Sequence, residues 1–172
     1  MSKLQTVVFL VRHGETDHFY SVDESIDKQR QLTGRGRAQA TVVGKYLAQF
    51  MPEIIYSSPL ERCRETAALI AKEIGDPKIE TTAKLAEIYS PEPRNEAGER
   101  GESIFSRILT KHAGEQVVCV THQYIIRYAV ADFRHSEYEH IPCDSADVYR
   151  FVFAGKILVE VTHLRPAHEI HS

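Results

Sequence analysis

Residues 6–16 read TVVFLVRHGET, a run of apolar and β-branched residues that ends abruptly in polar ones. An unbroken apolar run of this length predicts a strand buried on both faces, as in a parallel sheet. Arg12 and His13 follow it directly. A second run, QVVCVT at residues 116–121, ends in the same way with His122. The sequence therefore predicts two buried strands that each carry a histidine at the carboxyl end.

Segments typical of strands and helices alternate along the rest of the chain. Further short strands are predicted at residues 53–57, 78–82, 147–153 and 156–162. Helices are predicted after Thr33 as N-cap to residue 50, and at residues 59–74, 103–112 and 123–132. Residues 17–31 and 87–101 are predicted as loops, because Pro and Gly interrupt the second of these segments. This alternation predicts α/β architecture, a three-layer α/β/α sandwich with a mostly parallel central sheet.

Length and composition indicate one ordinary globular domain over residues 1–172, with residues 165–172 as a flexible tail. The formal net charge is −3, which argues against a general nucleic-acid binder. No apolar run approaches the length of a signal or membrane segment, so we expect a cytoplasmic protein without a membrane partner. Three cysteines without metal-type spacing are expected to be reduced thiols. The oligomeric state stays open.

The strand ends also predict a site. In open α/β sheets, ligands bind beyond the carboxyl ends of the strands. If the two histidine-bearing strands are neighbours, Arg12, His13 and His122 converge in one crevice. Arginine forks and helix N-termini suit the charge and the acceptor oxygens of a phosphoryl group, and a positioned imidazole can act as a nucleophile. Arg62 and the helix after His122 are further candidates for phosphate binding.

The order of several motifs makes this chemistry specific. RHGET at residues 12–16 closely resembles the signature of the histidine phosphatase superfamily, which includes the cofactor-dependent phosphoglycerate mutases. Four more blocks similar to that family follow in family order: LTGRGRAQA at residues 32–40, YSSPLERCRETA at 56–67, GES at 101–103 and VCVTH at 118–122. The resemblance covers most of the chain and implies a phosphoglycerate mutase-like fold of the compact phosphatase branch.

The resemblance also implies roles. His13 would take the phosphoryl group as a phosphohistidine, with its ring oriented by the carbonyl of Gly14. The phosphate oxygens would be bound by Arg12, Arg62 and His122, together with the backbone N–H of Gln123. Glu87 would be the general acid, and its carboxylate would then activate water. The resemblance implies no cofactor and no metal, since these cations neutralise the phosphate.

The sequence departs from the family pattern at three places that bear on these roles. Phe19 stands where the family often has a phosphate-binding asparagine, and Gln123-Tyr124 replaces a common Gly-Gly. The residues after Glu87 also differ, which leaves Glu92 and Glu96 as rival acids. The segment from 87 to 101 is short, so the helical insertion of many mutases is absent.

These features define one leading function and its rivals. The leading interpretation is a metal-independent phosphomonoester hydrolase acting on a phosphorylated small molecule or a phosphoprotein. The alternatives are a phosphohistidine-protein phosphatase, a mutase-type phosphotransfer, and a pseudoenzyme that binds phosphate without turnover. His163, His168 and His171 do not have the spacing of a known metal-hydrolase motif and are interpreted as part of a polar chain end.

Overall fold

The computed structural model describes residues 4–17, 23–89 and 94–170, and it contains one six-stranded sheet. The strand order is β3-β2-β4-β1-β5-β6. Neighbouring strands from β3 to β1 are parallel, whereas β5 is antiparallel to both β1 and β6. The strand bounds are β1 (Gln5–Arg12), β2 (Ile54–Ser57), β3 (Lys78–Thr81), β4 (Gln116–Thr121), β5 (Val148–Ala154) and β6 (Ile157–Leu164).

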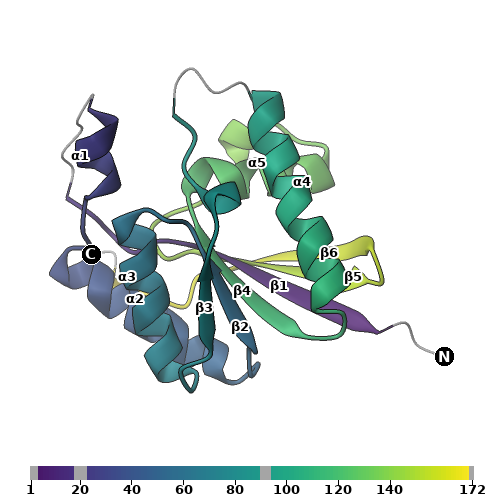
Figure 1. Cartoon of the computed structure of the whole chain (residues 1–172), viewed down its shortest axis with the longest axis horizontal. Coiled ribbons are helices and arrows are strands. Elements are labelled where there is room, and N and C mark those ends of the chain that lie inside the picture. Colours follow the sequence, from purple (N-terminus) through teal and green to yellow (C-terminus); the bar gives the residue numbers. More distant parts are fainter. Residues whose placement is uncertain (1–3, 18–22, 90–93, 171–172) are drawn as a thin grey trace.

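Helices cover both faces of this sheet. Helices α2 (Gly34–Ala48) and α3 (Glu61–Glu73) pack on one face, and α4 (Arg94–Lys111) and α5 (Gln123–Arg134) pack on the other (Figure 1). The short helix α1 (Glu24–Lys28) and the 3₁₀ turns η1 (Ala83–Leu85), η2 (Tyr138–His140) and η3 (His168–Ile170) complete the elements. The predicted α/β sandwich with a mostly parallel sheet is confirmed.

Strand β1 shows why its sequence is apolar throughout. Alternate side chains of a strand point to opposite faces of the sheet. Val8 and Leu10 belong to the core beneath α4 and α5, whereas Val7 and Phe9 belong to the core beneath α2 and α3. Because both faces are covered, no position from residue 6 to residue 11 of this central strand is left for a solvent-exposed side chain.

The helix α4 begins nine residues before the predicted start at residue 103, so the loop prediction for residues 87–101 is wrong over its second half. Gly98 and Gly101 do not end the helix, since a glycine inside a helix costs only about 1 kcal/mol relative to alanine. Tertiary contacts outweigh that cost. Nη1 of Arg100 donates to the backbone carbonyls of Ala83, Lys84 and Ala86, and the Nζ of Lys84 donates to Ser103.

The chain end also differs from its prediction. Residues 165–170, expected to be part of a flexible tail, are attached to the domain. The guanidinium of Arg165 pairs with Asp144 and Asp147, and Ala167 is packed in the core beneath α2 and α3. Residues 171–172 lie outside the described part of the chain. A short apolar core contact and two ion pairs are thus enough to hold a polar segment in place.

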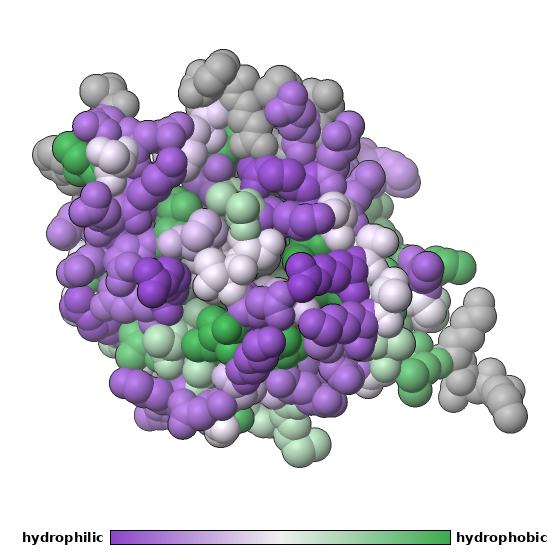
Figure 2. Space-filling view, in the orientation of Figure 1, coloured by the Kyte–Doolittle hydropathy of each residue, from purple (hydrophilic) through white to green (hydrophobic). Residues whose placement is uncertain are grey.

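The cysteines and the surface can be compared with what the amino-acid composition predicts. All three cysteines are buried and free, as expected for reduced thiols. The face of the molecule shown in Figure 2 is mainly hydrophilic, with small separate hydrophobic areas. Among the described residues, no helix combines the length and the apolar character that a membrane span requires.

The RHGET and LTGRGRAQA motifs are in direct backbone contact. A Cβ atom at Gly14 would lie 2.4 Å from the carbonyl oxygen of Gly36, and one at Gly36 would lie 2.1 Å from that of Glu15. The amide of Thr33 donates to the same Glu15 carbonyl (3.0 Å), and its hydroxyl caps α2 by accepting from the amide of Gly36 (3.0 Å). The loop after β1 is therefore positioned by the first turn of α2.

This contact leads to a prediction about stability. We expect Gly36→Ala to lower the free energy of unfolding by about 2 kcal/mol or more, because two backbone segments must move apart to admit the methyl group. Gly34→Ala is the matched control, because Gly34 lies in the same helical turn and a Cβ atom there would meet nothing within 4 Å. The control should be neutral or slightly stabilising. Urea unfolding of both variants measures the difference, and equal stabilities would contradict this account of the motif glycines.

Candidate active site

The two histidine-bearing strands are neighbours, as the predicted site requires. Strands β1 and β4 pair in parallel with Arg12 opposite Thr121, and the amide of His13 donates to the carbonyl of Thr121 (3.1 Å). The rings of His13 and His122 lie edge to face with their centroids 5.3 Å apart. The carboxyl ends of these strands thus bring both imidazoles together at one edge of the sheet.

The hydrogen bonds of His13 fix its tautomer. Its Nδ1 lies 2.8 Å from the carbonyl oxygen of Gly14, which can only accept, so Nδ1 carries the proton. Its Nε2 then has a lone pair and accepts from the Nε of Arg62 (3.3 Å). Burial, and then the neighbouring Arg12 and Arg62 guanidinium groups, hold the pKa of His13 well below its ordinary value. The imidazole is therefore neutral and has the protonation state of a nucleophile.

Two arginines flank this imidazole. Arg62 comes from the first turn of α3, and its side chain is only 1% exposed. Nη1 of Arg12 donates to the carbonyl of Cys143 (2.6 Å), while the Nε of Arg12 is buried without a hydrogen-bond partner among the described residues. A buried guanidinium is costly unless an anion compensates it; Arg62 has the Asp27 carboxylate at 3.3 Å, whereas Arg12 has no ion pair among the described residues. The Arg62 guanidinium beside the Nε2 atom of His13, together with the charge of Arg12 that acts on the same ring, is suited to a phosphoryl group.

The opposite side of the site holds His122 and Glu87. His122 is fully buried, and its Nε2 atom lies 2.8 Å from the hydroxyl oxygen of Ser58. Its Nδ1 atom lies 3.7 Å from a carboxyl oxygen of Glu87. The Glu87 side chain is 18% exposed, and burial raises the pKa of its carboxyl group. Burial, and then the electrostatic effects of His13 and Arg62, lower the pKa of His122.

Gln123 is the first residue of α5, with His122 as the N-cap. Its position places a backbone N–H at a helix N-terminus, which is a favourable place for an anion. With its amide oxygen turned toward Arg127, the Gln123 side chain accepts from both Nη atoms of that residue (2.8 and 3.1 Å). The Gln123 side chain is thus hydrogen-bonded to Arg127 on the same helix. The phosphate donor predicted for this residue is its backbone N–H.

The structure adds residues that the sequence did not point to. Asp27 on α1 accepts from Nη1 of Arg62 through both its carbonyl and its carboxylate (3.0 and 3.3 Å), and it pairs with Arg30. The hydroxyl of Tyr89 donates to the same carboxylate (2.6 Å). Residues 17–31 were predicted as loop. The signal that could have revealed α1 is Asp23, whose side chain caps the helix by accepting from the amide of residue 25.

Asp27 connects α1, Arg62 and the segment after Glu87, so its loss should disturb phosphate binding. We expect Asp27→Ala to lower kcat/KM for a phosphate ester about tenfold, because a charge-assisted hydrogen bond contributes about 1.5–3 kcal/mol. Steady-state kinetics measures this effect. Glu24→Ala is the control, since Glu24 lies on the same short helix and, within the described ranges, pairs only with the exposed Lys28. A similar loss in both variants would show a general effect of α1 instead.

Several other predicted candidates do not join this site. Phe19 and Glu92 lie outside the described residues. Glu96 is exposed on α4, and the Nε2 of His163 on β6 donates to the carboxylate of the buried Asp147 (2.8 Å). Within the described ranges, no group of three or more His, Cys, Asp or Glu side chains is arranged to hold a metal ion.

Fold and geometry together define an α/β protein with two histidines and two arginines gathered at the carboxyl ends of two parallel strands. The chain belongs to the histidine phosphatase superfamily, branch 1, whose family model matches residues 8–92 and 89–161. The family expected from the sequence motifs is therefore confirmed.

The proteins to which this chain is similar carry the names of different enzymes. A metal-independent phosphoserine phosphatase from Arabidopsis thaliana is 27% identical, over 71% of this chain and 66% of that protein. The phosphoglycerate mutase structure from Bacillus anthracis superposes with a TM-score of 0.79 at 18% identity, covering 95% of this chain and 94% of that one. The protein histidine phosphatase SixA, complexed with tungstate, gives 0.70 at 16% identity, covering 95% and 99%.

Proposed function

We propose that this protein is a phosphatase that hydrolyses phosphate monoesters without a metal ion, through a phosphohistidine intermediate on His13. The family and the phosphatase names among its relatives support phosphatase activity. The observation that carries the finer proposal is a neutral His13 together with a largely buried Glu87 that has a raised pKa and lies 3.7 Å from His122. A neutral imidazole is the form that a nucleophile needs, and burial shifts Glu87 toward the protonated form that a general acid needs.

The first step transfers the phosphoryl group to the imidazole. The Nε2 lone pair of His13 attacks phosphorus, the bond from phosphorus to the ester oxygen breaks, and the departing oxygen takes the proton of Glu87. Arg12 and Arg62 neutralise the charge on the equatorial oxygens. The carbonyl of Gly14 accepts from Nδ1–H and stabilises the positive charge that develops on the ring.

The second step releases inorganic phosphate. Glu87, now a carboxylate, takes a proton from a water molecule whose oxygen attacks phosphorus, and the bond from phosphorus to Nε2 breaks. The enzyme returns to a neutral His13 and a protonated Glu87, so one carboxyl group serves as acid and then as base.

A phosphohistidine-protein phosphatase is the second candidate, and the similarity to SixA over nearly its whole length favours it. A phosphohistidine leaves easily and does not require a carboxylic acid, so the position of Glu87 beside His122 favours esters. A mutase would have to retain its product, and the short segment after Glu87 offers little to exclude water.

The test is hydrolysis in the presence of EDTA of p-nitrophenyl phosphate, phosphoserine and a histidine-phosphorylated protein. We expect turnover of the esters with EDTA present. Turnover of the phosphohistidine alone would replace the ester proposal with the second candidate. No turnover of any of the three would support a phosphate-binding protein without catalysis.

A further inference from the structure

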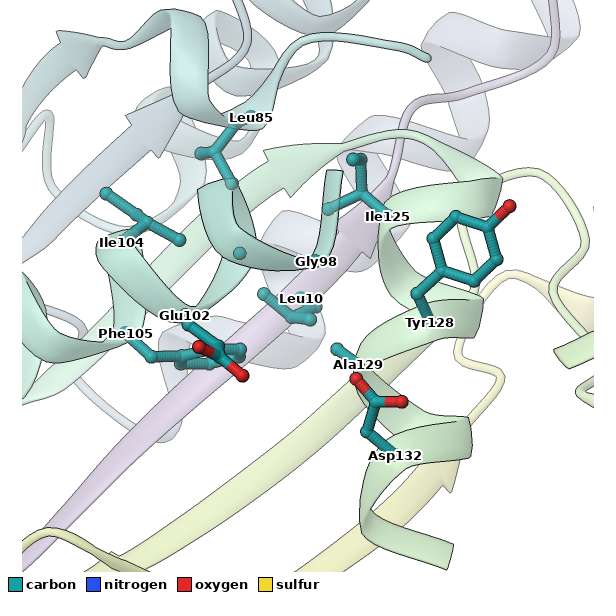
Figure 3. A pocket seen from close by; sticks show the side chains of 11 residues that line it. Leu10, Leu85, Gly98, Glu102, Ile104, Phe105, Ile125, Tyr128, Ala129 and Asp132 are labelled. Atoms are coloured by element: carbon teal, nitrogen blue, oxygen red, sulfur yellow. The ribbon is translucent and has the colours of Figure 1, made fainter. Parts of the chain in front are cut away.

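A pocket that contains none of the predicted site residues lies between α4 and α5, over the middle of β1 (Figure 3). Its volume is about 140 Å³, and its walls are mainly apolar. A cavity of this size admits a benzene-sized group. We propose that this pocket binds a small amphipathic amine, that is, a molecule with a compact apolar body and one ammonium group.

Two glycines open the pocket on the α4 side. Gly98 and Gly101 both line it, and a Cβ atom at either position would meet nothing within 4 Å. The facing position on α5 is the small residue Ala129. The floor is Leu10 of β1, and Leu85 and Ile125 form the end nearest to the catalytic segments (Figure 3). The small side chains on both helices thus leave an apolar space large enough for a ligand.

The other end of the pocket is negatively charged. Figure 3 shows the carboxylates of Glu102 and Asp132 at the end away from Leu85, one from each helix. Both side chains are exposed, and neither forms an ion pair with any residue of the described ranges. The ring of Tyr128 lines the pocket nearer to Ile125 (Figure 3). An ammonium group would therefore find two anions at one end of an apolar space.

A ligand in this pocket would touch the two segments that lead to Glu87 and His122. Leu85 ends the turn η1, two residues before Glu87, and the Leu85 carbonyl accepts from the hydroxyl of Thr121 at the end of β4 (2.7 Å). Ile125 lies in the first turn of α5, which His122 caps. A bound amine would contact the two segments that carry Glu87 and His122. This binding is independent of the proposed reaction, because it can be measured without turnover.

The test is isothermal titration calorimetry at low salt with 2-phenylethylammonium chloride and its neutral analogue 2-phenylethanol. We expect the ammonium compound to bind about tenfold more tightly than the alcohol, since two exposed carboxylates each contribute modestly. The double variant Glu102→Gln with Asp132→Asn should remove this preference and leave the affinity for the alcohol unchanged. Gly101→Leu should fill the pocket and abolish the binding of both compounds.

The control is Glu99→Gln with Glu137→Gln, which removes the same charge from exposed positions outside the pocket. It should keep the ammonium preference. Equal affinity for the two compounds, an equal effect of the control variant, continued binding to a folded Gly101→Leu variant, or no binding to the wild type would each overturn the proposal.

Discussion

Replacing His13 with alanine is expected to lower kcat for p-nitrophenyl phosphate by at least about a thousandfold, because the reaction loses its nucleophile. The structure supports this size of effect. In the proposed reaction the Nε2 atom of His13 attacks phosphorus, and the Nε of Arg62 contacts this atom directly, at 3.3 Å. A residual rate from the cationic site alone would be small. Steady-state kinetics with purified protein measures the effect.

His140→Ala is the matched control for this loss. His140 is an exposed histidine on η2, and its substitution should leave the rate unchanged within about twofold, as for surface substitutions in general. Because His13 is buried, unfolding by chemical denaturant must show that the alanine variant is still folded. A folded His13→Ala variant with more than a tenth of the wild-type rate would remove His13 from the mechanism.

Glu87→Gln is expected to lower kcat about a hundredfold to a thousandfold for esters with a poor leaving group such as phosphoserine, since general acid–base catalysis contributes that much. For p-nitrophenyl phosphate the first step should be nearly unaffected, because nitrophenolate leaves without a proton. The second step should still be slow.

Comparing the two substrates separates the acid role of Glu87 from its base role. Glu137→Gln, at an exposed position, is the control. Equal losses for both substrates in a pre-steady-state burst would contradict the acid role.

The pH dependence follows from the raised pKa of Glu87. Burial disfavours its charged form, so the proton is retained to a higher pH than in an ordinary carboxyl group. The acid is present below this raised pKa and is lost as the pH rises through it, so kcat for phosphoserine should fall on the alkaline side. In Glu87→Gln this fall should disappear. Meanwhile the lowered pKa of His13 keeps the nucleophile neutral into the acidic range.

Much of the fold was predictable because buried strands and helix caps are local signals. The apolar run before Arg12 is buried on both faces, and Thr33 caps α2 as expected. The sequence indicated that β1 and β4 each end in a histidine, but the pairing of these two strands was only a condition of the predicted site, and the structure supplies it. The buried strands and the cap depend on residues adjacent in sequence, so a single sequence reveals them.

The features that were missed depend on contacts between distant segments. The start of α4 is stabilised by Arg100, which donates to carbonyls of η1 some 14–17 residues earlier. Asp27 reaches Arg62 across 35 positions of sequence. The pocket between α4 and α5 required both helices to be placed before Gly101 could be seen as part of its wall. No local pattern encodes such contacts.

The most direct test of the central claim is chemical detection of the phosphoenzyme. Glu87→Gln mixed with p-nitrophenyl phosphate should form the intermediate readily and hydrolyse it slowly, so it should accumulate. Rapid quenching in base, which preserves phosphohistidine, followed by peptide mass spectrometry should find phosphate on His13, and none on the His13→Ala protein. Phosphate on another residue, or turnover by the wild type without any phosphoenzyme in either protein, would contradict the mechanism.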